Sequence, residues 1–256
     1  MCLILLAYES HPAYRLVLAA NRDEHRSRPT AAAAFWDDAP RLLAGRDLLQ
    51  GGTWLGITRN GRFAALTNYR EPATYLHGAP SRGLLVSNFL RGEMTADEYL
   101  AFLRREGRNY NGFCLLFGTA ERLRCHSNRT ENPPRLEPGI HGLSNHHLDS
   151  PWPKVVRGKE ALARLIAPEG ELDPEDLFSL LADRSPVPDH LLPDTGVGIE
   201  RERALAPLFI DTPGYGTRSS TILLITRSNT VTFVERTFDG SGDDPRTVSF
   251  RLTLPS

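Results

Sequence analysis

The amino-acid sequence predicts an α+β protein built from antiparallel sheets. Strand-like apolar segments come in pairs joined by short turns near both ends of the chain, and helix-like segments are grouped between them. Strands and helices do not alternate as they do in βαβ units, which argues against a parallel sheet. No polar or Pro-rich segment is long enough to separate two domains, so we expect residues 1–256 to form a single domain.

Four pairs of apolar segments are predicted as hairpins. Each pair is interrupted by a short turn, and in the second pair Asn60-Gly61 supplies the positive φ angles that a tight turn requires. In chain order, the pairs are LILLAY (3–8) with YRLVLAAN (14–21), two segments within 54–68, GFCLLFG (112–118) with RLRCHSN (122–128), and STILLIT (220–226) with TVTFVERTF (230–238). We expect the first strand to lie next to both its hairpin partner and strand 220–226.

Four helices are expected, and each has a local signal. Residues 81–91 form the first, and Thr95 with Glu98 has the spacing of a capping box at the start of the second. Asp173-Pro174 is typical of a helix start, and it opens the fourth. The apolar positions that would face the core are Leu100 and Leu103 in the second helix, Trp152, Val155, Leu162 and Ile166 in the third, and Leu177, Leu180 and Leu181 in the fourth.

Composition excludes several classes of protein. The chain is 40% hydrophobic with a net charge of -1, so it is neither disordered nor strongly attracted to nucleic acid. No stretch reaches the 18 or so apolar residues of a membrane helix, and the first ten residues lack the basic region of a secretory signal. We therefore expect a cytoplasmic protein with no transmembrane segment, no nucleic-acid partner and three free cysteines.

Cys2 is the residue whose position most suggests chemistry. Removal of Met1 would leave a thiol and a free α-amine on the same residue, and an amine with an ordinary pKa of about 7.7 to 8.0 can accept the thiol proton. The alternative is that Cys2 merely begins a strand. A polar run, NRDEHRSR (21–28), directly follows the second strand, where side chains project into a site or form a solvated turn.

Short motifs from the N-terminus to Thr221 resemble the NRDE family, which is the family of the transport and Golgi organisation protein 2. The motifs occur in the family's order. They are Met1-Cys2, Asn21-Arg22-Asp23-Glu24, Gly52-Thr53-Trp54-Leu55-Gly56, Thr67-Asn68-Tyr69-Arg70, Ser81-Arg82-Gly83, Tyr110-Asn111-Gly112-Phe113, Gly142-Leu143-Ser144-Asn145, Leu148 to Lys154, and Tyr215 to Thr221.

This resemblance implies a fold and an activity. The family is similar to the N-terminal-nucleophile (Ntn) hydrolases, with two antiparallel sheets between helix layers in a four-layer αββα sandwich. Within them it looks most like penicillin V acylase and choloylglycine hydrolase. The implied activity is a cysteine hydrolase or acyl transferase that acts on a non-peptide amide or thioester.

The resemblance also implies the site residues. The catalytic set is Cys2 as the nucleophile, Asp23, which orients the amine of Cys2, and Asn68 and Asn145, whose amides would donate hydrogen bonds to the oxyanion. Both asparagines could instead cap strand ends through side-chain hydrogen bonds to the backbone. Asn21, Arg22 and Arg218 are the implied substrate-binding residues. The enzymes place an arginine three residues before the aspartate, where this chain has Ala20, so Arg22 would approach the sulfur from another direction.

A second function is implied by the same family, whose members are linked to haem handling and to acyl-coenzyme A or lipid metabolism. A non-catalytic protein of this kind would bind haem, or carry a small hydrophobic or acyl-bearing molecule. Catalysis needs no cofactor in the first hypothesis. We expect no metal site, because His141, His146 and His147 do not have zinc-ligand spacing. The sequence leaves the substrate and the oligomeric state open.

Overall fold

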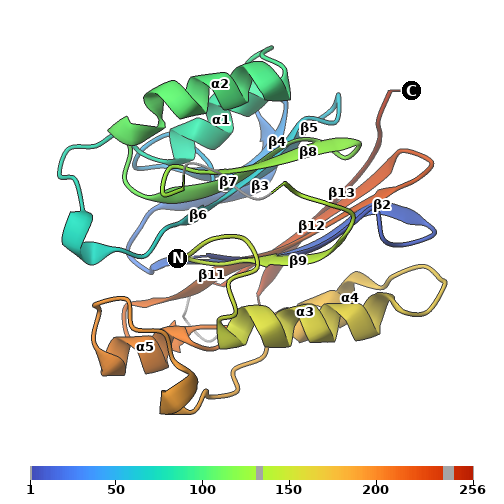
Figure 1. Ribbon diagram of the computed structural model, residues 1–256. Helices are drawn as coiled ribbons and strands as arrows, with labels where there is room; N and C mark the ends of the chain where they lie inside the picture. The colour runs from blue at the N-terminus through green and yellow to red at the C-terminus, as the bar shows by residue number, and fades with distance from the viewer. Residues whose placement is uncertain (1, 131–134, 239–244, 256) are drawn as a thin grey trace.

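Two antiparallel sheets lie face to face between two layers of helices (Figure 1). The computed structural model describes residues 2–130, 135–238 and 245–255. The first sheet has the order β13-β12-β11-β2-β1-β9, with β10 on β11, and the second has the order β3-β4-β5-β6-β7-β8. This is the layered α+β architecture that the sequence predicts.

The strands of the first sheet come from both ends and the middle of the chain. They are β1 (Cys2–Tyr8), β2 (Tyr14–His25), β9 (Gly139–Leu143), β10 (Asp211–Thr212), β11 (Tyr215–Thr226), β12 (Thr230–Thr237) and β13 (Arg246–Thr253). The second sheet is local in sequence: β3 (Thr30–Trp36), β4 (Ala39–Asp47), β5 (Leu55–Thr58), β6 (Phe63–Asn68), β7 (Phe113–Thr119) and β8 (Arg122–Ser127).

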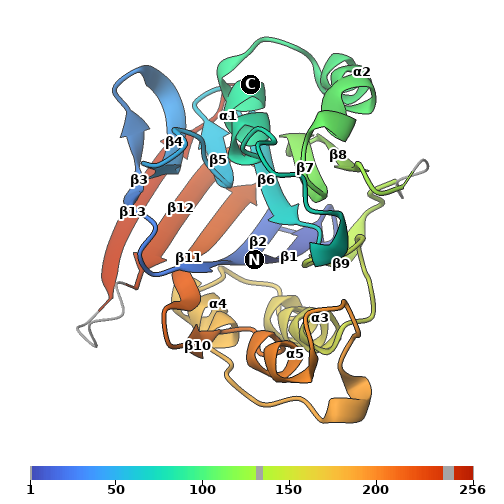
Figure 2. The ribbon, with the colours of Figure 1, turned by 90° about the vertical axis from the view of Figure 1, so that its left-hand side faces the viewer.

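Helices cover the outer face of each sheet (Figure 2). On the second sheet lie α1 (Gly83–Arg91) and α2 (Ala96–Glu106), and α2 begins with the predicted Thr95–Glu98 capping box. Under the first sheet lie α3 (Pro153–Ile166), α4 (Pro174–Leu181) and α5 (Ile199–Leu205). Short 3-10 turns occupy Pro72–Thr74, Gly107–Asn109 and Asp189–Leu191. None of the helices in the described part of the chain is long and apolar enough to cross a membrane.

The neighbours of β1 differ from the prediction. β1 pairs with β2 on one edge and with β9 on the other, so β2 separates it from β11 and the expected contact with strand 220–226 is wrong. The sequence pattern missed β9 because Gly139–Leu143 is short, contains two glycines and has no apolar alternation. β3, β4, β13 and α5 were also not predicted. In the second hairpin turn, Gly61 alone has the positive φ expected of both Asn60 and Gly61.

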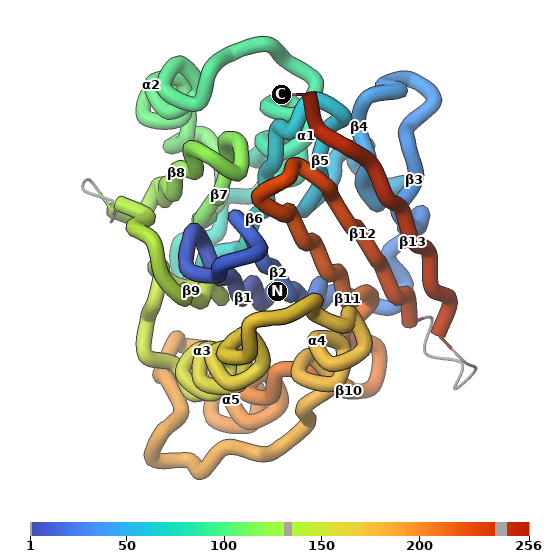
Figure 3. The backbone as a smooth tube through the Cα atoms, turned by 90° about the vertical axis from the view of Figure 1, so that its right-hand side faces the viewer, coloured from blue at the N-terminus to red at the C-terminus, as the bar shows by residue number. Residues whose placement is uncertain are grey.

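β1 is buried on both faces, which explains its unbroken apolar run. Ile4 and Leu6 point into the core between the sheets, while Leu3 and Leu5 point towards α3 and α4. The strand lies deep in the molecule (Figure 3), and Cys2 at its start is only 7% exposed. The two sheets thus share one core, and the first residue of β1 is held within it.

The contact between α1 and the second sheet depends on Gly52. A Cβ at this residue would lie 2.6 Å from the Gly83 carbonyl carbon and 2.7 Å from the Gly83 carbonyl oxygen. These are backbone atoms, which cannot move aside as the end of a flexible side chain could. We expect Gly52→Ala to lower the free energy of unfolding by about 1–3 kcal/mol. Chemical denaturation measures this loss. Gly170→Ala is the control, because no atom lies within 4 Å of its Cβ position. Equal stability of the two variants would contradict this account.

Candidate active site

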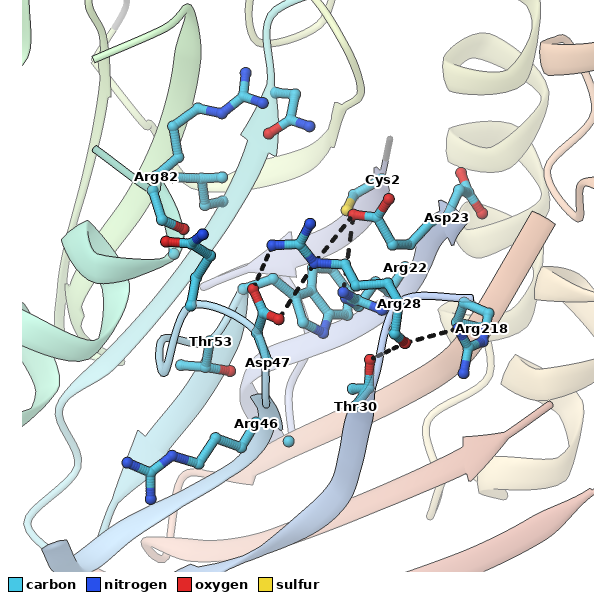
Figure 4. A pocket seen from close by; sticks show the side chains of 18 of the residues that line it. Cys2, Arg22, Asp23, Arg28, Thr30, Arg46, Asp47, Thr53, Arg82 and Arg218 are labelled. Carbon is cyan, nitrogen blue, oxygen red and sulfur yellow. Dashed lines mark hydrogen bonds and ion pairs between the residues drawn. The ribbon is translucent and has the colours of Figure 1, made fainter. Parts of the chain in front are cut away.

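A polar cavity of about 270 Å³ lies at the ends of β1, β2 and β6. Five of the predicted site residues line it: Cys2, Arg22, Asp23, Asn68 and Arg218. Most of the remaining lining is polar or charged. Figure 4 shows several of these side chains, including the Arg28–Asp47 ion pair, with its N–O distance of 2.6 Å, and Arg82 on the opposite wall.

Cys2 faces the space between the sheets, directly across from Arg22. The β1–β2 register pairs these two residues, so both side chains project from the same face of the sheet. Burial raises the pKa of the Cys2 thiol. The negative charge of Asp23 raises this pKa further, whereas the positive charge of Arg22 and a backbone hydrogen bond from Asp23 lower it. Arg22 thus provides, from the neighbouring strand, a cation that favours the thiolate.

Asp23 is directed towards the helix layer, on the other face of the sheet from Cys2. Its carboxylate accepts a hydrogen bond from Thr217 Oγ1 at 2.8 Å. Burial raises the pKa of Asp23, and the charge of Lys154 is the strongest effect that opposes this rise. Asp23 therefore lines the cavity and also interacts electrostatically with Lys154 on the helix side of the sheet.

Arg218 occupies a β-bulge opposite these residues. The pairing between β2 and β11 shifts between Thr217, which lies opposite Asp23, and Ser219, which lies opposite Arg22. The extra residue lets Arg218 Nη1 donate to the backbone carbonyls of His25, Arg26 and Arg28, at 3.0, 2.8 and 3.2 Å. The bulge thus aims Thr217 at Asp23 and uses Arg218 to hold the loop beyond β2.

Asn68 and Asn145 lie together, but only Asn68 lines the cavity. Asn145 is fully buried, and its Nδ2 donates to the Asn68 carbonyl at 3.0 Å. The neighbouring Ser144 Oγ donates to the Cys2 carbonyl at 3.2 Å. The Ser144-Asn145 segment therefore connects Asn68 at the end of β6 to the start of β1.

Asn21 does not line the cavity. Its Nδ2 donates to the carbonyls of Leu181 and Leu208 at 3.0 and 2.9 Å, and its Oδ1 accepts from Ser220 Oγ at 2.6 Å. Neighbouring residues of a strand point to opposite faces, so Asn21 faces the helices while Arg22 faces the cavity. Of the predicted site residues, Asn21 and Asn145 thus lie outside the cavity lining.

A buried charge cluster next to Asp23 was not predicted. Lys154 is 2% exposed, and burial lowers its pKa to about 8. Arg70 and Glu202 form an ion pair at 2.5 Å with side chains only 6% and 3% exposed. Sequence patterns favour exposed positions for charged side chains, and although Lys154 and Arg70 each end a family motif, no pattern indicated that they are buried.

The other two cysteines and His141 do not line the cavity. Cys114 and Cys125 are buried free thiols that lie opposite Ser127 and Leu116 rather than each other. His141 Nδ1 forms a hydrogen bond with Asp149 Oδ2 at 2.7 Å. Across residues 2–130, 135–238 and 245–255, no group of three His, Cys, Asp or Glu side chains is arranged to hold a metal ion.

Comparisons with known proteins identify relatives over the whole chain. The family model described as Transport and Golgi organisation 2 matches residues 1–240. Transport and Golgi organization protein 2 homologs from Bos taurus and Homo sapiens are each 37% identical over 98% of this chain and 99% of their own. Among solved structures, the Caenorhabditis elegans N-acylethanolamine-hydrolyzing acid amidase ortholog matches with a TM-score of 0.52 and 12% identity, covering 87% of this chain and 92% of its own. The fold is thus that of the Ntn hydrolases.

The Arg70–Glu202 pair secures α5 beside the site. Glu202→Gln would remove the carboxylate that pairs with the buried Arg70 guanidinium, so we expect a loss of about 3 kcal/mol in unfolding free energy. Urea denaturation measures it. Glu200→Gln is the matched control on the same helix: its side chain is 82% exposed and pairs with Arg203, so the cost should stay below about 1 kcal/mol. A loss no larger than that of the control would contradict the structural role of the buried pair.

Proposed function

We propose that this chain, which belongs to the Transport and Golgi organisation 2 family, is an N-terminal-nucleophile cysteine hydrolase or acyl transferase that attacks a non-peptide amide or thioester. The observation that carries the proposal is the place of Cys2: it begins a buried strand, faces a polar cavity, and lies opposite Arg22 and beside Asp23. We place its activity in the cytoplasm, where free thiols stay reduced.

Activation begins with removal of Met1, which frees the α-amine of residue 2. In the antiparallel β1–β2 pair, Cys2 lies opposite Arg22, so the chain direction brings the Cys2 nitrogen towards Asp23. The Asp23 carboxylate then holds and orients the amine. An amine that is neutral can take the proton from Sγ, and the Arg22 charge stabilises the thiolate that forms.

The reaction follows from these positions. The thiolate attacks the substrate carbonyl carbon, a C–S bond forms, and the carbonyl electrons move to oxygen. The Asn68 amide at the cavity wall donates a hydrogen bond to that oxyanion, held in place by Asn145. Collapse expels the amine or thiol leaving group, which takes the proton from the α-ammonium. Water, or an acceptor nucleophile in a transferase, then releases the acyl group from Cys2.

The charges of the cavity favour a polar acyl substrate with an anionic group. Arg82 donates to the Gly112 carbonyl at 2.9 Å, and within the described residues it forms no ion pair. Arg22 reaches the cavity from β2 and Arg82 from the turn before α1, so both cations line the space that an anionic group would enter. A purely apolar ligand would desolvate both cations, of which Arg22 has Glu24 at 3.9 Å and Arg82 has no ion-pair partner among the described residues.

Carriage of haem or an acyl lipid without turnover is the alternative. No histidine is among the described residues that line the cavity, so the iron ligand there would be Cys2 or Tyr75. Haem titration into wild type and Cys2→Ser tests this role. A spectral signature of thiolate-ligated haem that Cys2→Ser removes would favour carriage over hydrolysis, provided that no acyl adduct forms.

Covalent trapping tests the hydrolase directly. Intact mass first shows that the protein sample has lost Met1. After exposure to amide and thioester donors that carry a carboxylate, this protein should gain an acyl group on residue 2. Cys2→Ser should lower the rate by at least about 100-fold, because a hydroxyl is a far poorer nucleophile at neutral pH. Asn68→Ala should lower kcat more than it changes KM, since an oxyanion donor acts mainly in the transition state.

The matched control is Cys114→Ser, which changes another buried thiol outside the cavity. It should retain the wild-type rate. Retention of Met1, or equal acylation of wild type and Cys2→Ser, would refute the hydrolase.

A further inference from the structure

We propose that His141, as an imidazolium bonded to Asp149, is a positioning residue that closes the 142–149 loop onto the backbone of Cys2 and Asn68. The inference rests on the proposed function, because Cys2 and Asn68 are residues that the proposed reaction uses. Neither His141 nor Asp149 lines the cavity. They therefore act through the loop rather than on the substrate.

The 142–149 loop connects the end of β9 to the site. Ser144 Oγ donates to the Cys2 carbonyl at 3.2 Å, and Asn145 Nδ2 donates to the Asn68 carbonyl at 3.0 Å. Both contacts run from a buried side chain of the loop to the backbone of a site residue, one at the start of β1 and the other at the end of β6. The relative position of the nucleophile and the oxyanion donor therefore depends on the shape of this loop.

Asp149 closes the base of the loop. Its backbone N–H donates to the Gly142 carbonyl at 2.8 Å, and its Oδ1 accepts from the Gly142 N–H at 2.9 Å and from Lys159 Nζ at 2.5 Å. Asp149 also has a φ of 57°, a left-handed conformation that few residues other than glycine adopt. Its bonds hold this conformation, so the orientation of the Asp149 carboxylate sets the closed form of the loop.

His141 completes this closure with both of its ring nitrogens. Nδ1 lies 2.7 Å from Asp149 Oδ2, and Nε2 lies 2.8 Å from the Glu137 carbonyl oxygen. A carboxylate and a carbonyl oxygen can only accept hydrogen bonds, and a neutral imidazole has a single N–H to donate. Only the imidazolium satisfies both contacts, so the geometry itself selects the protonated ring.

The charged groups around His141 support the same protonation state. The hydrogen bond to Asp149 raises the pKa of His141, and it outweighs burial and the charge of Lys159 on α3, which lower it. Burial raises the pKa of Asp149, but its bonds to His141, Lys159 and a backbone N–H bring it down to about 2. Glu137 pairs with Arg135 at 3.3 Å, and the residue of β1 opposite His141 is apolar.

The closure is complete only while His141 is charged. Because its pKa in the folded protein lies above the ordinary 6.5, the stabilisation is fully present below pH 6.5 and is lost as the pH rises through the folded-state pKa. Asp149 stays ionised throughout this range, since its own pKa is about 2. Rising pH therefore removes one donor from the closure, which loosens the loop and slows the reaction at Cys2.

Ring 15N NMR of histidine-labelled protein tests the charge directly. The His141 signal, identified by its absence in His141→Gln, should show protons on both ring nitrogens at pH 6 and titrate above 6.5. Amide hydrogen exchange then follows the loop. Relative to α2, and after correction for intrinsic rates, protection of residues 143–149 should fall about tenfold as His141 loses its proton, which corresponds to one charge-assisted hydrogen bond.

Substitution tests whether the pH dependence belongs to His141. In His141→Gln the loop should have low protection at every pH, because glutamine carries no charge. His190→Gln is the matched control, since His190 is exposed in the Asp189–Leu191 turn, and it should keep the wild-type pH dependence. A neutral His141 ring at pH 6, or loop protection that stays constant across the His141 titration, would overturn the inference.

The pH profile of acylation connects the loop to the reaction and separates this inference from the proposed function. In wild type, kcat/KM should fall at alkaline pH with the pKa of His141, and this limb should be absent in His141→Gln, whose rate is lower throughout. An alkaline limb unchanged in His141→Gln would leave the hydrolase standing and overturn the positioning role. Loop protection that follows the His141 titration, without any acylation of Cys2, would support the closure and refute the hydrolase.

Discussion

The antiparallel register of β1 on β2 is the constraint on which the site depends. It places Cys2 opposite Arg22, and it brings the nitrogen of Cys2 towards Asp23. The bulge at Arg218 then turns Thr217 onto Asp23 from the next strand. A slip of one residue would exchange the faces of every side chain in β1, burying the thiol against the helices. Pairing of β1 with β2 on one edge and with β9 on the other holds it in this register.

Alternation along this strand pair separates two environments. Arg22 and Cys2 face the polar cavity, whereas Asn21 and Asp23 face the helices. The thiol therefore faces the polar cavity on one side of the sheet, while buried charged residues lie on the other side. Asp23 joins the two, since it lines the cavity edge and interacts with Lys154.

Much of the fold could be predicted from local patterns, but the site only in part. Hairpins such as 220–238 and the Thr95 capping box have short-range signals, and the structure confirms them. β9 has none, because Gly139–Leu143 is defined by its pairing with β1. Asn21 was assigned to the substrate by its motif, and only strand pleating shows that it faces the helices. Lys154 and Glu202 are buried by long-range packing, which no residue pattern encodes.

The central claim is that residue 2 carries an activated thiol in an otherwise unreactive set of cysteines. Burial raises the pKa of Cys114 to about 11 and that of Cys125 further still, so neither should react near neutral pH. The most direct measurement is the rate of alkylation at each cysteine between pH 6 and 8, located by peptide mass spectrometry on protein lacking Met1. The account predicts that Cys2 reacts at least about tenfold faster than Cys114 throughout that range. Alkylation of Cys2 no faster than that of Cys114 would contradict it.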